Sequence, residues 1–173
     1  MRLCTWVLET SDFKPNRAIL LCAGIKEIGK DATMIFNKRL PSTNDKDIVI
    51  ETRDELEKYD LLIGFYTLGF DLKFLNSRLM YWNKRPLDRR LHLDVYRVAK
   101  TLFNTSSRSL GALTQFLNIP GKNHVDFTFW QSAVMEGDKK AMKYIIEHCR
   151  LDLEILEQLH NRIKRQIKSI SLA

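Results

Sequence analysis

The sequence predicts a single α/β domain in which helices flank a mixed central β-sheet. Three apolar, β-branched segments come first, helical and strand-like patterns then alternate, and the remainder is helical, an order typical of this fold class. No linker rich in Gly, Ser or Pro and no internal repeat divides the 173 residues, and a hydrophobic fraction of 45% is sufficient to bury a core. We therefore predict one domain over residues 1–173.

Five segments have the apolar and β-branched composition of strands. They are 2–9, 19–27, 32–37, 61–65 and 90–94. Turn-forming residues separate the first two segments, which predicts two paired strands joined by a loop. The polar stretch 41–46 is interpreted as a long surface turn.

The other segments have apolar residues at helical spacing. They are a helix that begins at Thr52 and the ranges 68–82, 95–103, 109–117, 127–136 and 138–168. The last range is the longest predicted element, and it contains the most informative local pattern.

The charge balance restricts the partners. A total of 28 Lys and Arg against 21 Asp and Glu gives a net charge of +7 and an isoelectric point near 9.4, which favours an anionic partner without identifying it. The basic residues within 84–90 and 162–168 are interpreted either as solvated faces or as phosphate contacts.

Cysteine usage and hydropathy indicate the compartment. Cys4, Cys22 and Cys149 include no Cys-x-x-Cys pair, so we expect buried thiols and neither a disulfide framework nor a zinc site. No run approaches the ~20 apolar residues that cross a bilayer, and Glu9 interrupts the first apolar run too early for a signal peptide. We expect a soluble, intracellular, cytoplasmic protein that does not contact a membrane.

Asp152 lies on the apolar stripe of the long C-terminal helix. The stripe consists of Ile145, Cys149, Leu156, Leu159 and Ile163. A buried, unpaired carboxylate costs several kcal/mol, so an acid on this stripe needs a cation, several donors or solvent at the edge of a cleft. His148 lies one turn earlier on the same side of the helix. The alternative is a partly exposed Asp paired with a Lys or Arg.

Two further acids adjoin apolar segments. Alternation in the first strand puts Val7 and Glu9 on one face and Trp6 and Leu8 on the other, so Glu9 ends a strand that is apolar on both sides. Asp71 lies near the start of a predicted helix, where the helix dipole favours an acid. Each also has a plainer interpretation, Glu9 as a solvated acid at a strand end and Asp71 as a helix-start acid.

Three acids from three separate segments are typical of a site for hard cations. Such cations prefer oxygen ligands, and phosphodiester hydrolysis uses two of them about 4 Å apart to activate water and to stabilise the leaving oxygen. The sequence lacks the motifs of competing chemistries, which are a Gly-rich loop followed by Lys-Ser/Thr, His-Glu-x-x-His and Gly-x-Ser-x-Gly.

At these residues the sequence resembles the DEDD superfamily of 3′→5′ exonucleases, over nearly its whole length and most closely the uncharacterised predicted-exonuclease branch. The family pattern is an Asp-x-Glu strand, a mid-chain Asp, and a late helix with Tyr-x-x-x-Asp or His-x-x-x-x-Asp. The similar segments are WVLETSD at 6–12, IGFYTLGFDLKFL at 63–75, LHLDVYR at 91–97 and EHCRLDLEIL at 147–156.

The resemblance implies a ribonuclease H-like fold with a mixed five-stranded sheet and two Mg²⁺ or Mn²⁺ ions. It also implies hydrolytic removal of nucleotides from the 3′ end of single-stranded DNA or RNA. By motif position, the metal ligands are Glu9, Asp71 and Asp152.

The same resemblance places Thr10 and Phe13 beside the terminal nucleotide, and Tyr66 at a position often filled by Asn, where we expect an altered substrate contact. Phe13 is equally interpreted as ordinary packing. The aromatic group at 127–130 is interpreted either as core or as a surface on which bases stack.

Two positions depart from the family pattern. Val7 stands where the family has its first Asp, and a valine neither binds a metal nor orients water, so turnover is in question. His148 stands at the four-residue spacing where the family more often has Tyr. An imidazole with an ordinary pKa of about 6.5 can position or deprotonate the attacking water, and the alternative is a hydrogen-bonded surface residue.

Three hypotheses follow from these residues. The first is a metal-dependent exonuclease, weakened or silenced at Val7, in which His148 and Glu9 are catalytic. The second is a catalytically inactive pseudo-nuclease that binds nucleic acid ends. The third is a protein-interaction domain that retains the fold for packing alone.

Overall fold

The computed structural model describes residues 1–31, 33–37, 43–120, 126, 128–167 and 171–173. Its strands are β1 (Leu3–Thr10), β2 (Leu20–Glu27), β3 (Thr33–Asn37), β4 (Leu61–Gly64), β5 (Leu91–Asp94) and β6 (Ser171–Leu172). Its helices are α1 (Lys46–Leu56), α2 (Asp71–Tyr81), α3 (Val95–Leu102), α4 (Leu110–Phe116), α5 (Thr128–Glu136) and α6 (Lys139–Ile163), which the short 3₁₀ helix η1 (Lys164–Gln166) follows.

The strands form one mixed sheet in the order β3-β2-β1-β4-β5-β6. β1 is antiparallel to β2 and parallel to β4, and β4 is parallel to β5. All five predicted strands are present, so the predicted mixed α/β sheet is confirmed. The two-residue β6, which was not predicted, pairs antiparallel with β5 at the edge.

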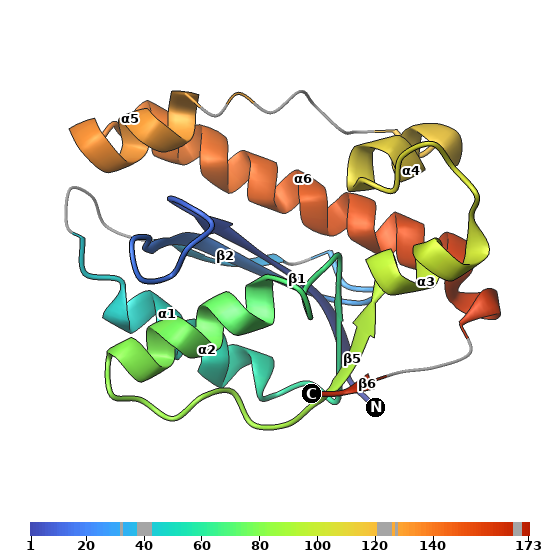
Figure 1. Cartoon of the computed structure of the whole chain (residues 1–173), viewed down its shortest axis with the longest axis horizontal. Helices are drawn as coiled ribbons and strands as arrows, with labels where there is room; N and C mark the ends of the chain where they lie inside the picture. Colours follow the sequence, from blue (N-terminus) through green and yellow to red (C-terminus); the bar gives the residue numbers. More distant parts are fainter. Residues whose placement is uncertain (32, 38–42, 121–125, 127, 168–170) are drawn as a thin grey trace.

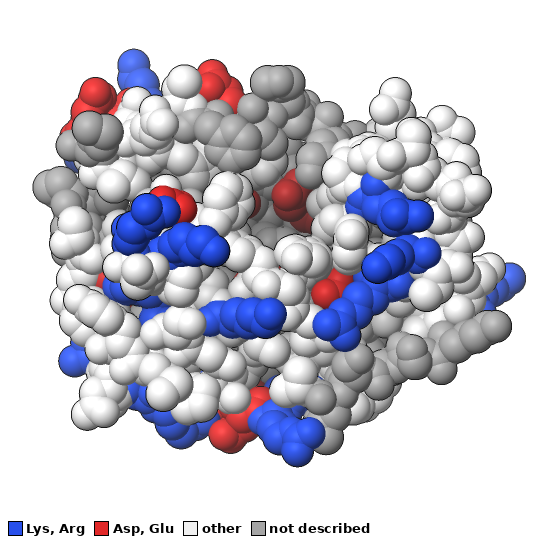
Figure 2. All heavy atoms as spheres, viewed as in Figure 1, with Lys and Arg blue, Asp and Glu red and all other residues white. Residues whose placement is uncertain are grey.

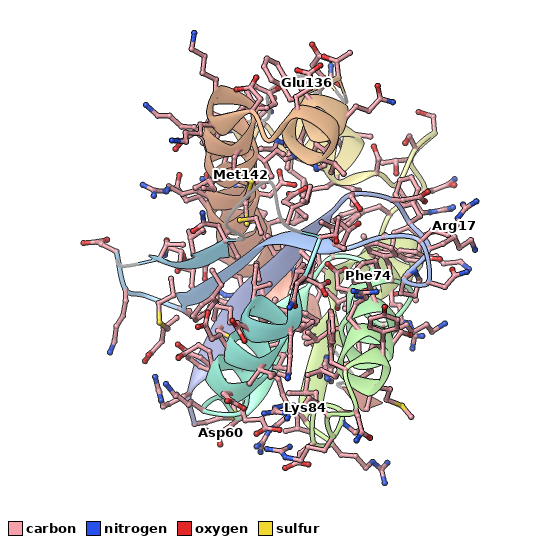
Figure 3. The ribbon with its side chains drawn as sticks, turned by 90° about the vertical axis from the view of Figure 1, so that its left-hand side faces the viewer. Arg17, Asp60, Phe74, Lys84, Glu136 and Met142 are labelled. Carbon is pink, nitrogen blue, oxygen red and sulfur yellow. The ribbon has the colours of Figure 1, made fainter. Side chains whose placement is uncertain are left out.

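Helices cover both faces of the sheet (Figure 1), with α1 and α2 on one side and α6 on the other. In Figure 3, Phe74 on α2 and Met142 on α6 lie on opposite sides of the sheet. Side chains of β1 contribute to both layers, since Trp6 and Leu8 pack with α1 and α2 whereas Val7 packs on the α6 side. The predicted two-sided burial of the first strand is therefore confirmed.

The predicted start of the first helix was wrong. α1 begins at Lys46 and not at Thr52, because the carbonyl of Asp45 accepts a hydrogen bond from Val49 N (3.1 Å) and so starts the helix earlier. Asp45 is fully buried, whereas we interpreted 41–46 as a surface turn. Residues 41 and 42 of that stretch lie outside the described part of the chain.

The predicted end of the long helix was also wrong. α6 ends at Ile163, η1 follows, and the chain then returns to the sheet. The backbones of Arg90 and Ala173 exchange two hydrogen bonds of 2.8 and 3.0 Å beside β5. The free edge of a strand offers unpaired N–H and C=O groups, and this pairing fills them. Lys168, the predicted end, lies outside the described residues.

Other expectations agree with the structure. The apolar stripe of α6, consisting of Ile145, Cys149, Leu156, Leu159 and Ile163, is buried. The three cysteines are buried free thiols. Within the described ranges, no helix combines the length and the apolar character needed to cross a membrane.

Candidate metal centre

The predicted acids lie at the same end of the sheet, where its parallel strands finish. β1, β4 and β5 are mutually parallel, so their carboxyl ends face the same way. Glu9 lies near the end of β1, Asp71 starts α2 after the loop that follows β4, and Asp94 ends β5. α6 packs against β1 and β2 and contributes His148 and Asp152 to this region. In Figure 2, acidic side chains lie in a recess of the surface, with Lys and Arg side chains nearby.

Glu9, His148 and Asp152 form the core of the site. Each offers one ligand atom, and these atoms lie within 4.8 Å of one another. His148 Nε2 lies 3.6 Å from Asp152 Oδ2, and both side chains are largely buried. The i, i+4 spacing on α6 brings the imidazole and the carboxylate together. The indole of Trp130 packs edge-on against the imidazole, with 5.5 Å between ring centroids, and forms one wall beside His148.

Asp71 is close to β1 but lies outside that cluster of three. Its Oδ1 accepts a hydrogen bond from Leu8 N at 3.0 Å, which joins α2 to the strand residue between Val7 and Glu9. Burial raises the pKa of Asp71 to about 7, although hydrogen bonds from backbone N–H groups lower it, and the nearby charge of Asp94 raises it further. Near neutral pH this carboxyl is therefore only partly ionised, and a neighbouring cation would favour its charged form.

Asp94 is a residue whose role the sequence did not reveal. Its carboxylate accepts hydrogen bonds from the backbone N–H groups of Tyr66 (2.8 Å), Leu68 (3.2 Å) and Tyr96 (3.1 Å). It thereby caps α3 and holds the loop between β4 and α2, which leads into Asp71. Its position at the carboxyl end of a strand parallel to β4 was a usable signal, because that end of the sheet gathers the polar residues of the site.

The remaining predicted site residues do not belong to the cluster of Glu9, His148 and Asp152. Val7 packs among apolar side chains on the α6 side and supplies no ligand atom. Thr10 Oγ1 donates to the carbonyl of Asp12 at 3.0 Å. Phe13 is 71% exposed, and its ring contacts Phe70 edge-on.

Tyr66 is 51% exposed, in the loop that Asp94 holds. Its φ of +62° lies in the left-handed region, which an aromatic residue rarely adopts. The hydrogen bond from Tyr66 N to Asp94 helps to hold the backbone of this exposed residue in that conformation.

The aromatic group at 127–130 belongs to the packing, as far as the structure describes it. Trp130 is buried, and Phe129 stacks on Tyr144 with ring centroids 4.2 Å apart. Phe127 lies outside the described residues. This favours the core interpretation over base stacking.

Parts of the two basic segments are engaged within the protein. Arg85 pairs with Glu57 and Asp88, and Arg162 donates to the carbonyl of Leu117. The charges of these side chains are already engaged by groups of the protein. They are poor candidates for contacts with an anionic partner.

The residues at this end of the sheet fit a divalent cation. Two carboxylates and one imidazole place their ligand atoms close together in a partly buried position. Carboxylate oxygens suit Mg²⁺ and Mn²⁺. Val7 removes one ligand that the DEDD resemblance would place on the same face.

The mixed sheet and the acids at the ends of its parallel strands are typical of an RNase H-like domain. The sequence matches the family described as RNase_H superfamily over residues 8–164, which include Glu9, Asp71, His148 and Asp152. The chain therefore belongs to the RNase H superfamily.

A solved structure supports the same fold. The chain is similar to the family B DNA polymerase from the hyperthermophilic archaeon Pyrobaculum calidifontis, with a TM-score of 0.77 and 13% sequence identity. The similarity covers 95% of this chain and 24% of the polymerase chain. The predicted ribonuclease H-like fold is thus confirmed. None of the curated proteins matches the sequence.

Proposed function

We propose that this domain is a metal-dependent 3′→5′ exonuclease of the DEDD type that hydrolyses phosphodiester bonds of single-stranded DNA or RNA. The observation that carries the proposal is the convergence of Glu9, His148 and Asp152. Membership in the RNase H superfamily and the likeness to a DNA polymerase support it.

In this proposal Glu9 and Asp152 hold Mg²⁺ or Mn²⁺ at the cluster, and Asp71 serves the neighbouring ion position. When bound, such cations stabilise the charge that develops on the phosphate and lower the pKa of water. Thr10, Phe13 and Tyr66 adjoin the substrate at the same end of the sheet.

His148 has the role of a general base in this proposal. Oδ2 of Asp152 lies 3.6 Å from Nε2 of His148, so the imidazole would accept a proton from the attacking water beside a negative charge. The carboxylate then stabilises the imidazolium that forms. Trp130 limits the movement of the ring.

A second candidate, a pseudo-nuclease that binds ends without cutting them, is favoured by one observation. Val7 packs against the apolar clusters of the α6 layer, so the strand position that should supply a ligand is integrated into the core. Both candidates bind metal and single-stranded nucleic acid, but only the exonuclease cleaves it.

Metal binding is tested by thermal unfolding with and without Mn²⁺. A ligand at 100 times its Kd stabilises the folded state by about 2.7 kcal/mol, so saturating Mn²⁺ should raise the Tm of the parent and not that of Asp152→Ala. Glu154→Ala is the matched control, because Glu154 is an exposed acid on the same helix. If Mn²⁺ changes the Tm of the parent and of Asp152→Ala equally, the proposed metal site is wrong.

Turnover is tested with Val7→Asp, which restores a carboxylate on the same strand face as Glu9. Each ~1.4 kcal/mol removed from the barrier is tenfold in rate, so we expect at least about a hundredfold faster metal-dependent trimming of 5′-labelled single strands. Val7→Asn, of equal shape but uncharged, and Val7→Asp with Asp152→Ala should lack the gain. If a well-folded Val7→Asp trims neither DNA nor RNA, the exonuclease proposal fails and the pseudo-nuclease remains.

A further inference from the structure

A surface hollow lies between α2 and α3, outside the cluster of Glu9, His148 and Asp152. It has a volume of about 660 Å³. Its lining includes Leu68, Lys73, Asn76, Ser77 and Arg97. Figure 2 shows Lys and Arg side chains on this face, over the region where Figure 1 places α2 and α3.

The two cationic side chains of this hollow are exposed and, among the described residues, unpaired, unlike the arginines described above. Lys73 and Arg97 are exposed, and within the described residues neither forms an ion pair, whereas Arg78 and Arg85 each bind a carboxylate. Leu72 and Ala173, the last residue of the sequence, complete the described lining, which contains no Asp or Glu side chain. Unpaired cations on a concave surface concentrate positive potential, which attracts phosphate groups.

An exposed aromatic ring adjoins the hollow. The ring of Tyr66 lies over Gly69, where a Cβ atom would come within 2.4 Å of Tyr66 Cζ, so the absence of a side chain at 69 makes room for it. Tyr96 contacts the ring edge-on, with 5.1 Å between centroids. One face of the tyrosine is thus backed by the protein, while half of the residue is exposed.

One carboxylate holds both the loop that carries Tyr66 and the start of the helix that carries Arg97. Asp94 accepts from the N–H groups of Tyr66, at the left-handed φ of +62°, and of Leu68, which lines the hollow. It also caps α3, on which Tyr96 contacts Tyr66 and the next residue is Arg97. The loop that carries Tyr66 and the start of the helix that carries Arg97 are therefore fixed to each other by Asp94.

We propose that Tyr66 and this hollow form a nucleotide subsite, in which a base of a single strand stacks on Tyr66 and the backbone phosphates lie against Lys73 and Arg97. Stacking on an aromatic ring beside a basic groove binds single strands without reading their sequence. Asp94 is the positioning residue of this subsite. The choice of nucleic acid as ligand rests on the proposed function, whereas the location of the subsite does not depend on catalysis.

The phosphate half of the subsite is tested by binding of a fluorescein-labelled dT12 in EDTA over a range of salt concentrations. Lys73→Gln with Arg97→Gln should weaken binding at least about tenfold. It should also reduce the slope of log K against log salt by about 1.4, since each lost contact to a single strand contributes about 0.7. Lys139→Gln with Arg165→Gln, which removes the same charge at the two ends of the α6 region, should change affinity less than about twofold.

The stacking half is tested with 2-aminopurine placed at successive positions of the strand, because stacking on tyrosine quenches its fluorescence. Tyr66→Phe should retain the quenching, whereas Tyr66→Leu should lose it and bind at least about fivefold more weakly. Gly69→Ala should behave like Tyr66→Leu, because the new Cβ displaces the tip of the ring and leaves the backbone in place. Phe116→Leu is the control, since Phe116 is exposed on α4, outside the hollow.

The outcomes separate this inference from the proposed function. Suppose that the parent binds the oligonucleotide and Val7→Asp trims it, while the variants at 66, 69, 73 and 97 bind as their controls do. That result would overturn the subsite and leave the proposed function in place. If folded parent binds no strand at low salt, the proposed function fails and the inference fails with it. Circular dichroism and Tm of every variant confirm that it is folded.

Discussion

Two buried aspartates that adjoin helix α2 have opposite surroundings. Along its length, Arg78 donates to both oxygens of Asp45 at 2.9 and 2.6 Å, and Asp45 also accepts from the indole of Trp82 and from Leu20 N. At its start, Asp71 accepts from Leu8 N, and within the described residues it forms no ion pair with a Lys or Arg. The carboxylate of Asp45 accepts hydrogen bonds from three protein groups, whereas the carboxyl of Asp71 has no cationic partner among the described residues.

The electrostatics of Asp71 follow from this difference. Its burial raises its pKa to about 7, with a smaller contribution from the charge of Asp94. Strongly shifted carboxyls in concave regions are typical of functional sites. Asp45 therefore stabilises the fold, and Asp71 is suited to bind a ligand. Four predictions test this contrast.

The largest effect is expected at the carboxylate of Asp45. Asp45→Ala leaves Arg78 buried without its partner, which should lower the free energy of unfolding by about 3–5 kcal/mol in urea denaturation. Asp45→Leu with Arg78→Leu should recover much of the loss, because no buried charge remains. A loss below about 1 kcal/mol in Asp45→Ala would mean that this pair is not the structural element that we infer.

Asp71→Asn should act in the opposite direction when metal is absent. The pKa of Asp71 is raised from 3.8 to about 7 in the folded state, so stability that is present below about pH 4 is lost as the pH rises to about 7. The neutral amide should avoid this cost and raise the free energy of unfolding by about 2 kcal/mol at pH 8 in chelator, with little change at pH 4. Saturating Mn²⁺ should stabilise this variant less than the parent. An equal increase in the free energy of unfolding at pH 4 and pH 8 would contradict a raised pKa of Asp71.

His92 sharpens the contrast, because it is a buried titratable group away from the site. It is 1% exposed, neither ring nitrogen has a hydrogen-bond partner among the residues that the structure describes, and burial lowers its pKa to about 4. The stability that its neutral form allows is present above about pH 6.5 and is lost as the pH falls toward 4. His92→Leu should therefore unfold less readily at pH 4.5, by about 1 kcal/mol, and equally at pH 8. Chemical denaturation at the two pH values measures the difference.

The smallest effect is expected for the exposed counterpart of the Asp45–Arg78 pair. Arg85 binds both oxygens of Glu57 at 2.6 Å, and its side chain is half exposed. Solvent screens such a pair, so Arg85→Gln should leave the Tm within error of the parent. A large destabilisation there would show that bidentate geometry, and not burial, explains the stability of the Asp45–Arg78 pair.

The site was predictable where one element alone contained the signal. Asp152 interrupts an apolar stripe of fixed helical spacing, and the same spacing brings His148 beside it. Glu9 and Val7 share a face because strand side chains alternate. The partners of Asp45 and Asp94 were not predictable, because Arg78 and the N–H group of Tyr66 lie far from them in sequence, although the position of Asp94 at a strand end was a usable signal.

The sequence alone determined the fold class, the five main strands, the placement of Val7 and Glu9 on one strand face, and the acid and imidazole on the long helix. Periodicity encodes these features locally. Only the tertiary structure decided that α1 starts at Lys46, that the chain end pairs with β5, and that Asp71 stays apart from the three clustered ligands. These three features depend on contacts between residues that are distant in sequence. Burial and charge act through space and not along the chain, so local patterns do not encode them.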